Sequence, residues 1–426
     1  MQAPSPSSPP RAVWPRALAL TLLVGLACGV SSGVFLMALD AVTQARLRHP
    51  ALVWGLPLAG VLLGAFYDRW GARVQGGTNV VLDHLSTAGS PGIAARMAPM
   101  VLLGTLVTHL FGGSAGREGT AVQIGASLGD NLARRLGADP SLARRMTLAG
   151  VAGGFGAVFG TPFAGALFAI EFGVVGALEV RAAPWLLASA LVGDRVTRAM
   201  GVRHTAFPPV EGVALGPSLA LRWLVFAAAV ALLVRLFHAL TDGIKHQLAA
   251  RLSSRPARLA LGGATVLLLT ALVPDAGRYL GLGVSGIVAA FGAQDTAAWA
   301  PLAKLVFTAV TLGAGFIGGE VTPLFFMGAC LGATLSGPLG LPPSLAAAVG
   351  LATTFGTAAN APIALTVMAV ELYGPGVAPH ALLVGAVAWA LVGHRSLYSA
   401  QRWARDKRLA RLEGRPSTRE LSDRAW

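Results

Sequence analysis

Long apolar segments recur along the whole chain, and they constrain its fold more than any other feature. The first two cover residues 17–39 and 51–67, and the last covers residues 381–392. Hydrophobic residues make up 54% of the chain and charged residues only 12%, whereas soluble domains carry about 25% charged residues. A helix of about 20 apolar residues can cross a bilayer, where it satisfies its own backbone hydrogen bonds. We therefore predict an all-α, polytopic membrane protein.

The distribution of charge predicts how the chain is organised and placed. The net charge is +14, and Lys and Arg collect on the cytoplasmic side of membrane proteins. A Pro- and Ser-rich arm (residues 1–16) and a basic tail (residues 399–426) flank one membrane domain (residues 17–398). We expect a disordered arm, both termini in the cytoplasm, and a multi-pass protein of a bacterial inner (plasma) membrane. Nucleic-acid binding is not expected, because the basic residues lie in short runs between apolar segments.

Three residues inside the apolar segments need separate interpretation. Cys28 and Cys330 indicate neither a disulfide framework nor a thiolate metal site, and no cofactor is expected. A lipoprotein cleavage site at Cys28 is an alternative, but the apolar run continues through Met37, which favours an uncleaved span. We expect the Lys304 side chain to extend toward the membrane interface.

The two halves of the chain carry the same motif at a constant offset of 200 residues. Its members are Phe155, Gly156, Pro162 and Glu171 in the first half, and Phe355, Gly356, Pro362 and Glu371 in the second. Gly and Pro interrupt the apolar segments at these places and predict broken helices. Repeats with interrupted spans indicate a transporter whose binding site lies at the repeat interface. We place the repeat halves at about residues 17–200 and 201–398.

An Arg117-Glu118 pair lies within a glycine-rich stretch of the membrane part. A carboxylate in a membrane-type sequence is costly and is by default a functional site. The flanking Gly116 and Gly119 let backbone N–H groups approach a ligand closely. If a helix begins here, its free N–H groups and its dipole favour an anion. Glu118 is therefore a titratable group where an anion could also bind; the alternative is a structural ion pair with Arg117.

Four short pieces together resemble one family. They are residues 77–79 (Gly-Thr-Asn), 116–120 (Gly-Arg-Glu-Gly-Thr), 318–323 (Gly-Gly-Glu-Val-Thr-Pro) and 396–398 (Ser-Leu-Tyr). This set resembles the CLC chloride channels and transporters, and more narrowly their fluoride-exporting branch. The Gly-Arg-Glu-Gly piece is the strongest motif, and the resemblance covers nearly the whole membrane part. It implies a CLC-type fold of two inverted repeats with broken and tilted helices, and a homodimer with one pore in each subunit.

The resemblance also implies roles for individual residues. Glu118 matches the gating glutamate, which occupies the anion site when charged and swings away to carry a proton. Glu320 would hold or receive the Glu118 side chain and relay its proton, and Tyr398 matches the inner-gate tyrosine in position. The predicted anion-binding residues are Thr78, Asn79, Gly116, Arg117, Gly119, Thr120, Val321, Thr322, Phe325 and Phe326.

Departures from the chloride-transporting members favour fluoride as the substrate. Those members carry a Gly-Ser-Gly-Ile-Pro piece whose serine faces the ion. This chain has Asn79 there, or Thr78 if the alignment shifts by one residue, and Leu82 where the proline would be. An amide offers two N–H donors, which suits a small, strongly hydrated anion that loses its water. Asn79 could equally be a helix N-cap.

The piece around Glu320 also resembles the fluoride branch, where this glutamate and Thr322 belong to the pattern. A second buried carboxylate near Glu118 would favour proton uptake by one of the pair, because like charges repel. Thr322 could offer its hydroxyl to the anion or to Glu118. The alternative is that Glu320 is exposed in a wet loop.

Several other positions allow more than one interpretation of their role. Phe325 and Phe326 could offer electropositive ring edges to an anion or simply pack. Tyr398 could be an interfacial aromatic residue. The internal proton glutamate of chloride/proton exchangers aligns with Phe172, next to Glu171, so the inner proton route stays open.

The sequence thus predicts a fluoride/proton antiporter that exports cytoplasmic fluoride using inward proton flow. A chloride/proton antiporter or a passive CLC-type chloride channel is the alternative. The expected partners are fluoride or chloride, protons, the lipid bilayer and a second copy of the chain. An enzyme is not expected: residues 112–116 fit a Gly-x-Ser-x-Gly nucleophile pattern and Ser285 loosely resembles an intramembrane protease serine, but no orienting acid can be named.

Overall fold

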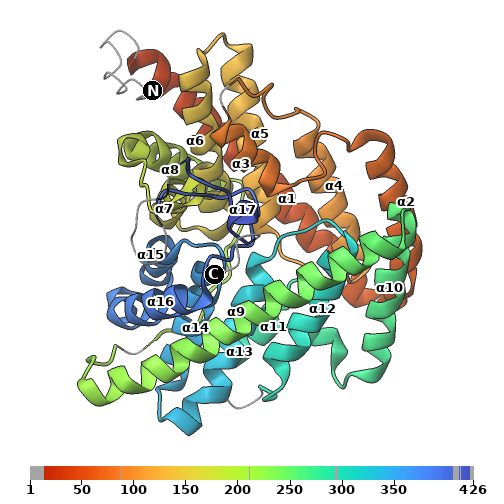
Figure 1. The fold of residues 1–426 in the computed structure, drawn as a ribbon, viewed down its shortest axis with the longest axis vertical. Coiled ribbons are helices and arrows are strands. Elements are labelled where there is room, and N and C mark those ends of the chain that lie inside the picture. Colours follow the sequence, from red (N-terminus) through yellow and green to blue (C-terminus); the bar gives the residue numbers. More distant parts are fainter. Residues whose placement is uncertain are drawn as a thin grey trace.

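The computed structural model describes residues 14–87, 89–210, 212–292, 296–405, 412 and 414–422, and these residues form mostly helices (Figure 1). The first half contains α1 (Trp14–Arg48), α2 (Leu56–Trp70), α3 (Thr78–Ser86), α4 (Met97–Leu110), α5 (Glu118–Arg135), α6 (Pro140–Phe159), α7 (Pro162–Gly173) and α8 (Ala183–Ala199). The second half contains α9 (Pro217–Arg251), α10 (Arg255–Leu272), α11 (Val284–Ala290), α12 (Ala300–Ala314), α13 (Val321–Leu339), α14 (Pro343–Ala358), α15 (Pro362–Tyr373) and α16 (Ala378–Val392). The predicted all-α fold is confirmed.

The helices differ in whether they are long enough to cross a bilayer. Among the described residues, five stretches are long and apolar enough: α1, Pro50–Trp70, α9, α13 and Pro375–Val392. Other apolar helices, including α7 and α15, have only 10–17 residues, which is too few for a full span. Pro162 and Pro362 begin α7 and α15, directly after the ends of α6 and α14. The predicted helix breaks at these prolines are confirmed.

The two halves pack against each other through their repeated motif. In Figure 1 the first half fills the upper part and the second half the lower part, with α7 and α15 side by side. Glu171, near the end of α7, accepts the backbone N–H of Ala364 in the first turn of α15 (2.7 Å). Glu371, near the end of α15, accepts the N–H of Ala164 in the first turn of α7 (2.7 Å). Each glutamate therefore neutralises the positive end of the other repeat's helix.

Glycine allows very close packing inside each half. Gly125 of α5 faces Gly150 of α6, and Gly328 of α13 faces Gly350 of α14. A Cβ atom on any of the four would overlap the carbonyl oxygen of its partner. Small residues of this kind let membrane helices approach closely, and the same contact occurs in both repeats.

Lys304 does not extend toward an interface, so that prediction is wrong. Its side chain is fully buried, and Nζ donates hydrogen bonds to the carbonyls of Tyr279 (3.0 Å) and Gly281 (2.7 Å). Nζ also lies 5.6 Å from the centre of the Phe326 ring. The carbonyls of the loop before α11 supply the partners that interfacial water would otherwise provide.

The segments that flank the membrane domain are described in part. Residues 1–13 of the predicted arm lie outside the described residues, and α1 begins at Trp14, ahead of the boundary we placed after residue 16. In the tail, β2 (Arg402–Trp403) pairs in parallel with β1 (Val174–Val175). The tail also contains α17 (Thr418–Ser422). Its described residues thus pack on the helical domain.

Candidate anion site

Two glycine turns, one from each repeat, cross at the centre of the site. The Gly116 N–H donates to the Gly319 carbonyl (2.6 Å), and the Gly319 N–H donates to the Gly116 carbonyl (2.8 Å). A Cβ at Gly116 would lie only 3.0 Å from the Gly319 oxygen and from Oε2 of Glu118. Helix α5 begins at Glu118 and α13 at Val321, so the positive ends of both helices point toward this crossing.

The Glu118 carboxylate occupies a ring of hydrogen-bond donors at the crossing. Its side chain is buried, and Oε2 accepts the backbone N–H groups of Arg117 (3.1 Å) and Thr322 (3.2 Å). Oε1 accepts the Thr322 hydroxyl at 2.6 Å, and Nε of Arg117 lies 3.4 Å from it. The ion pair with Arg117 that we kept as the alternative is present, and three further donors also hold the carboxylate. Such a set of donors can equally hold a free anion.

Two cavities lie at the crossing, and carboxylates line both: Glu118 the smaller one, and Glu320 and Asp242 the larger one. The smaller cavity, of about 20 Å³, is lined by Glu118, Thr322 and Phe325 among others. The larger cavity, of about 280 Å³, is lined by Glu320 and Tyr398 among others. Arg117 and Thr322, whose groups hold the Glu118 carboxylate, also line the smaller cavity.

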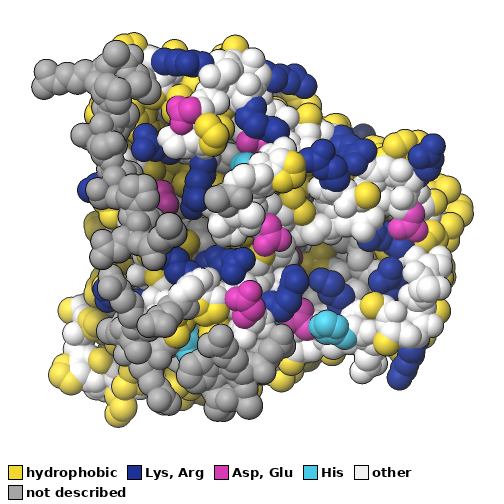
Figure 2. All heavy atoms as spheres, turned by 45° about the horizontal axis from the view of Figure 1, so that its top comes forward, with side chains coloured by type: hydrophobic (Ala, Val, Ile, Leu, Met, Phe, Trp, Pro, Cys, Tyr) yellow, Lys and Arg dark blue, Asp and Glu magenta, His cyan; other side chains and the backbone are white. Residues whose placement is uncertain are grey.

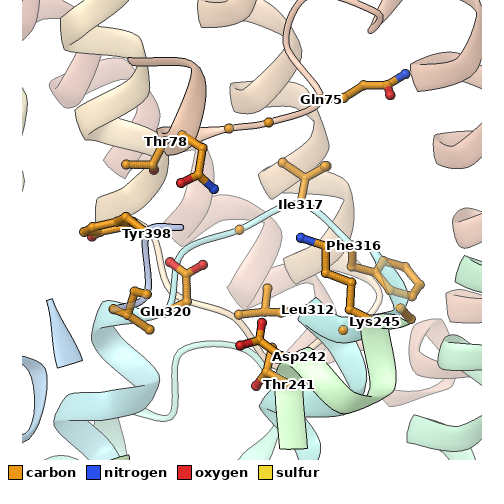
Figure 3. A pocket seen from close by; sticks show the side chains of 18 of the residues that line it. Gln75, Thr78, Thr241, Asp242, Lys245, Leu312, Phe316, Ile317, Glu320 and Tyr398 are labelled. Atoms are coloured by element: carbon orange, nitrogen blue, oxygen red, sulfur yellow. The ribbon is translucent and has the colours of Figure 1, made fainter. Parts of the chain in front are cut away.

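The larger cavity brings together Thr78, Asn79, Glu320 and Tyr398, which the sequence had singled out. Figure 3 shows Thr78, Tyr398 and Glu320 on one side of it and Lys245 and Asp242 on another. Glu320 is half-buried, so the exposed-loop alternative is wrong. Its Oε2 lies 3.7 Å from the position a Cβ would take at Gly119, against the first turn of α5. Basic residues also line this cavity, namely Lys245, Arg255 and Arg258.

Helix α3 brings two donor side chains to the larger cavity. Gly77 is its N-cap with φ of 55°, so the N-cap alternative for Asn79 is wrong. Thr78 Oγ1 accepts a hydrogen bond from Nε2 of Gln123 on α5 (3.1 Å). Asn79 Oδ1 accepts the backbone N–H of Ala400 (2.9 Å).

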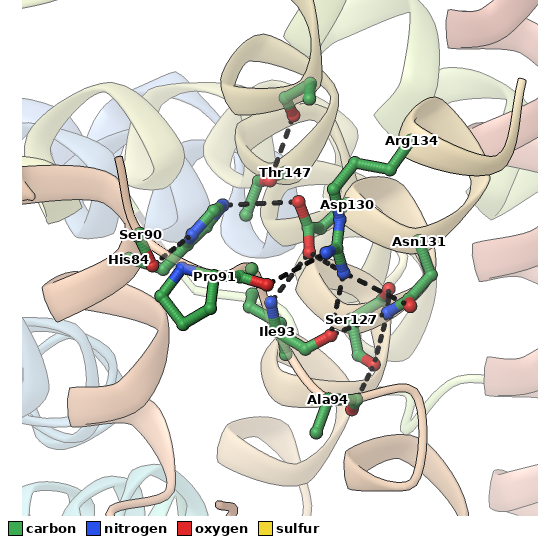
Figure 4. A network of polar contacts seen from close by, with 12 residues as sticks. His84, Ser90, Pro91, Ile93, Ala94, Ser127, Asp130, Asn131, Arg134 and Thr147 are labelled. Carbon is green, nitrogen blue, oxygen red and sulfur yellow. Dashed lines mark hydrogen bonds and ion pairs between the residues drawn. The ribbon is translucent and has the colours of Figure 1, made fainter. Parts of the chain in front are cut away.

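A polar network anchors the other end of α3 to α5 (Figure 4). His84 Nε2 lies 3.3 Å from Oδ1 of the buried Asp130, and Nδ1 lies 2.9 Å from the Ser90 hydroxyl. Oδ2 of Asp130 accepts the Ile93 N–H (2.7 Å) and pairs with Arg134 (2.8 Å). The position of α3 therefore depends on several contacts outside the cavity.

Tyr398 is a buried residue of the site. Its ring packs edge-on against Phe172, with ring centres 5.4 Å apart, and its N–H donates to the Ser396 hydroxyl (3.1 Å). The alternative of an interfacial aromatic residue is therefore wrong. Tyr398 can narrow the larger cavity next to Glu320.

Some predicted residues lie away from the two cavities. The Thr120 hydroxyl is buried and lies 2.6 Å from that of Thr105, so it serves helix packing. Phe326 packs on Lys304 and lines a different cavity, whereas Phe325 lines the one beside Glu118. Val321 and Gly119 frame the crossing with their backbone.

Sequence reasoning missed Gln123, Asp242 and Lys245. Gln123 follows Glu118 on the same helix, but the spacing of five residues does not place the two on one helix face, so no local pattern marks it. Asp242 and Lys245 lie on α9, and no motif marks them. In the described part of the chain, no group of three His, Cys, Asp or Glu side chains could hold a metal ion.

The amino-acid sequence is similar to those of known proteins over most of its length. Residues 58–393 match the family described as "Voltage gated chloride channel". The chain is 40% identical over 400 residues to the "Chloride/fluoride channel protein" of Pseudomonas syringae pv. tomato, a match that covers 92% of this chain and 87% of that protein.

Solved structures are similar over nearly the whole chain. The crystal structure of a CLC-type fluoride/proton antiporter matches with a TM-score of 0.89 and 31% identity, over 93% of this chain and 100% of that one. The structure of a slow cyanobacterial Cl⁻/H⁺ antiporter matches with a TM-score of 0.78 and 18% identity, over 89% of this chain and 94% of that one. The second likeness shows the fold alone. The predicted CLC-type fold is confirmed.

Proposed function

The chain belongs to the voltage-gated chloride channel family, and on that premise we propose that it is a fluoride/proton antiporter. The observation that carries this proposal is the position of Glu118. Its carboxylate fills a set of donors that suits an anion, at the crossing between two cavities. One site that holds either a carboxylate or a free anion can couple the movement of protons to that of the anion.

The proposed cycle assigns a task to each side chain. Charged Glu118 closes the path by occupying the donors of Arg117 and Thr322. Protonated Glu118 no longer needs those donors and swings away with its proton, which leaves the site to fluoride. Glu320 receives or relays the proton on the side of the larger cavity, and Tyr398 forms the inner constriction.

The anion contacts are proposed from the same geometry. Thr322 donates at the crossing, and Thr78 and Asn79 donate from α3 into the larger cavity. The backbones of the two glycine turns lie beside the path, and Phe325 lines the smaller cavity.

Fluoride is favoured over chloride by two kinds of support. Asn79 and Glu320 depart from the chloride-transporting pattern toward that of the fluoride branch, and both line the larger cavity. The relative from Pseudomonas syringae is named for chloride and fluoride, and the most similar structure reported above is that of a fluoride/proton antiporter. A chloride/proton antiporter or a passive chloride channel is the second candidate, because the relative from Pseudomonas syringae is named for chloride as well as fluoride, and as a channel.

We further propose that the larger cavity opens to the cytoplasm of a bacterial inner membrane and that the protein is a homodimer. The start of α1 contacts the end of α5 through Arg16 and Leu136, and β1 pairs with the tail. These segments carry many Arg residues, and Lys and Arg side chains spread over the middle of the face in Figure 2. Lys and Arg collect on the cytoplasmic side, so both termini would be cytoplasmic.

Purified protein in liposomes loaded with fluoride tests the proposed function. A fluoride electrode and a pH electrode record the external medium together. We expect fluoride efflux with alkalinisation outside, because protons enter as fluoride leaves, and an inward proton gradient should drive fluoride out against its own gradient. Liposomes loaded with chloride and liposomes without protein are the controls. Fluoride efflux without a pH change would identify a passive channel, and equal rates for chloride would favour the second candidate.

A further inference from the structure

The oxygen atoms of both α3 donors are already occupied by N–H groups of the protein. Nε2 of Gln123 donates to the Thr78 hydroxyl oxygen (3.1 Å), and the Ala400 N–H donates to the Asn79 amide oxygen (2.9 Å). Among the described residues, neither the Thr78 hydroxyl proton nor the Asn79 NH₂ group is used in a hydrogen bond of its own. Both residues line the larger cavity.

This arrangement decides whether hydrogen-bond donors or lone pairs of these two side chains face the cavity. A hydroxyl and an amide can each donate or accept a hydrogen bond, so on their own they could face the cavity with lone pairs. An anion needs donors, and lone pairs would repel it. When an N–H group holds the oxygen, the proton of the same side chain is the group that remains for the cavity.

We propose that Gln123 is a positioning residue for anion recognition, because it turns Thr78 into a donor toward the larger cavity. Gln123 itself lines the larger cavity, but its amide N–H is taken up by the Thr78 oxygen, so we assign its effect on the anion to the orientation of the Thr78 hydroxyl. The inference rests on the proposed function. It adds to the proposed anion site a residue that none of the sequence motifs contains. The Ala400 N–H plays the same part for Asn79, which shows the arrangement twice on one helix.

We expect α3 to keep its position when Gln123 is changed. His84 and Ser90 anchor the far end of this helix, and Asp130 of α5 holds both His84 and the Ile93 N–H. Gln123→Met keeps the length and bulk of the side chain and removes only its amide. We therefore expect this variant to fold and to remain monodisperse.

A double-mutant cycle between Gln123→Met and Thr78→Val tests the inference. Fluoride affinity and the fluoride-to-chloride ratio of initial rates are measured in proteoliposomes. Thr78→Val should weaken fluoride affinity about tenfold to a hundredfold, since a hydrogen bond to an ion is lost. Gln123→Met should weaken it about two- to tenfold, since the hydroxyl is present but no longer oriented. In the Thr78→Val background, Gln123→Met should have no further effect.

Two further variants sharpen the result. Gln123→Glu offers only oxygen to Thr78, so the hydroxyl should turn toward the carboxylate and the loss should exceed that of Gln123→Met. Gln75→Met is the matched control, because Gln75 lines the same cavity but bonds the Tyr67 carbonyl (3.3 Å); it should keep the wild-type ratio.

The outcomes separate this inference from the proposed function. Additive losses in the cycle, or a wild-type ratio in Gln123→Met, would overturn the role of Gln123 while the wild type still exchanges fluoride for protons. A wild type that moves no fluoride would overturn the proposed function itself, and the inference with it. A packing defect would slow fluoride and chloride equally, so an unchanged ratio with slower fluxes also counts against the positioning role.

Discussion

Glu118→Gln removes the charge of this side chain and keeps its size, and the structure gives the expected magnitude. Three hydrogen bonds hold the wild-type carboxylate, from the N–H groups of Arg117 and Thr322 and from the Thr322 hydroxyl. Hydrogen bonds to charged groups contribute about 1.5–3 kcal/mol each and typical ones about 0.5–1.5 kcal/mol. The neutral amide therefore binds about 1 kcal/mol more weakly at each of the three bonds, or about 3 kcal/mol in total, which is roughly a hundredfold.

The amide also fits the site poorly in either orientation. If its NH₂ group takes the place of Oε2, it meets the N–H groups of Arg117 and Thr322, which are donors as well. If the NH₂ group takes the place of Oε1 instead, it faces another donor, Nε of Arg117, which lies 3.4 Å from Oε1 in the wild type. We therefore expect fluoride to displace the glutamine readily, so that fluoride efflux continues while proton movement stops, because an amide does not titrate at neutral pH.

Simultaneous fluoride and pH recordings from proteoliposomes measure this uncoupling. Glu371→Gln is the matched control, since Glu371 also accepts two backbone N–H groups, those of Phe163 (3.1 Å) and Ala164 (2.7 Å), but it lines neither cavity. The control should keep the wild-type ratio of protons to fluoride. Proton flux at the wild-type ratio in Glu118→Gln would refute the role of this carboxylate.

Four other substitutions have defined outcomes. Asn79→Ser should raise chloride flux relative to fluoride flux, because one hydroxyl proton replaces two amide donors. If ion-electrode assays give the variant the same chloride-to-fluoride ratio as the wild type, Asn79 does not determine selectivity. Glu171→Ala should lower the free energy of unfolding by about 2–3 kcal/mol, because the N–H groups in the first turn of α15 lose their buried acceptor. A variant that stays as monodisperse as the wild type after heating would contradict this. Gly125→Ala should cost about 1–3 kcal/mol through overlap with Gly150, whereas Gly337→Ala, with nothing within 4 Å, should be slightly stabilising. Identical melting temperatures in detergent for these two glycine variants would count against the packing argument.

Much of the fold could be predicted because its signals are local. Apolar length marks the spans, and Pro162 and Pro362 mark the breaks. The start of a helix at Glu118 also follows from the glycines around it. The offset of 200 residues revealed the two repeats, although not that Glu171 and Glu371 cap each other's helices.

The details of the site could be predicted only in part. The sequence singled out both Thr120 and Thr322, and only Thr322 reaches Glu118. Adjacent phenylalanines were equivalent in the sequence, yet Phe325 lines the cavity beside Glu118 and Phe326 packs on Lys304. Side chains on a helix point in different directions, so the neighbours of each depend on how the helices pack.

The sequence by itself determined that this chain forms membrane helices in two broken repeats, with a carboxylate at a glycine turn, because burial of apolar segments and backbone freedom at glycine act over a few residues. Only the tertiary structure decided that the Gly116 and Gly319 turns join, that Glu118 lines the smaller cavity and Glu320 the larger one, and that Gln123 and Ala400 hold the oxygens of the α3 donors. These contacts join residues that are distant in the sequence. Packing of one repeat on the other creates the Gly116–Gly319 contact, whereas Gln123 reaches Thr78 by packing within the first repeat.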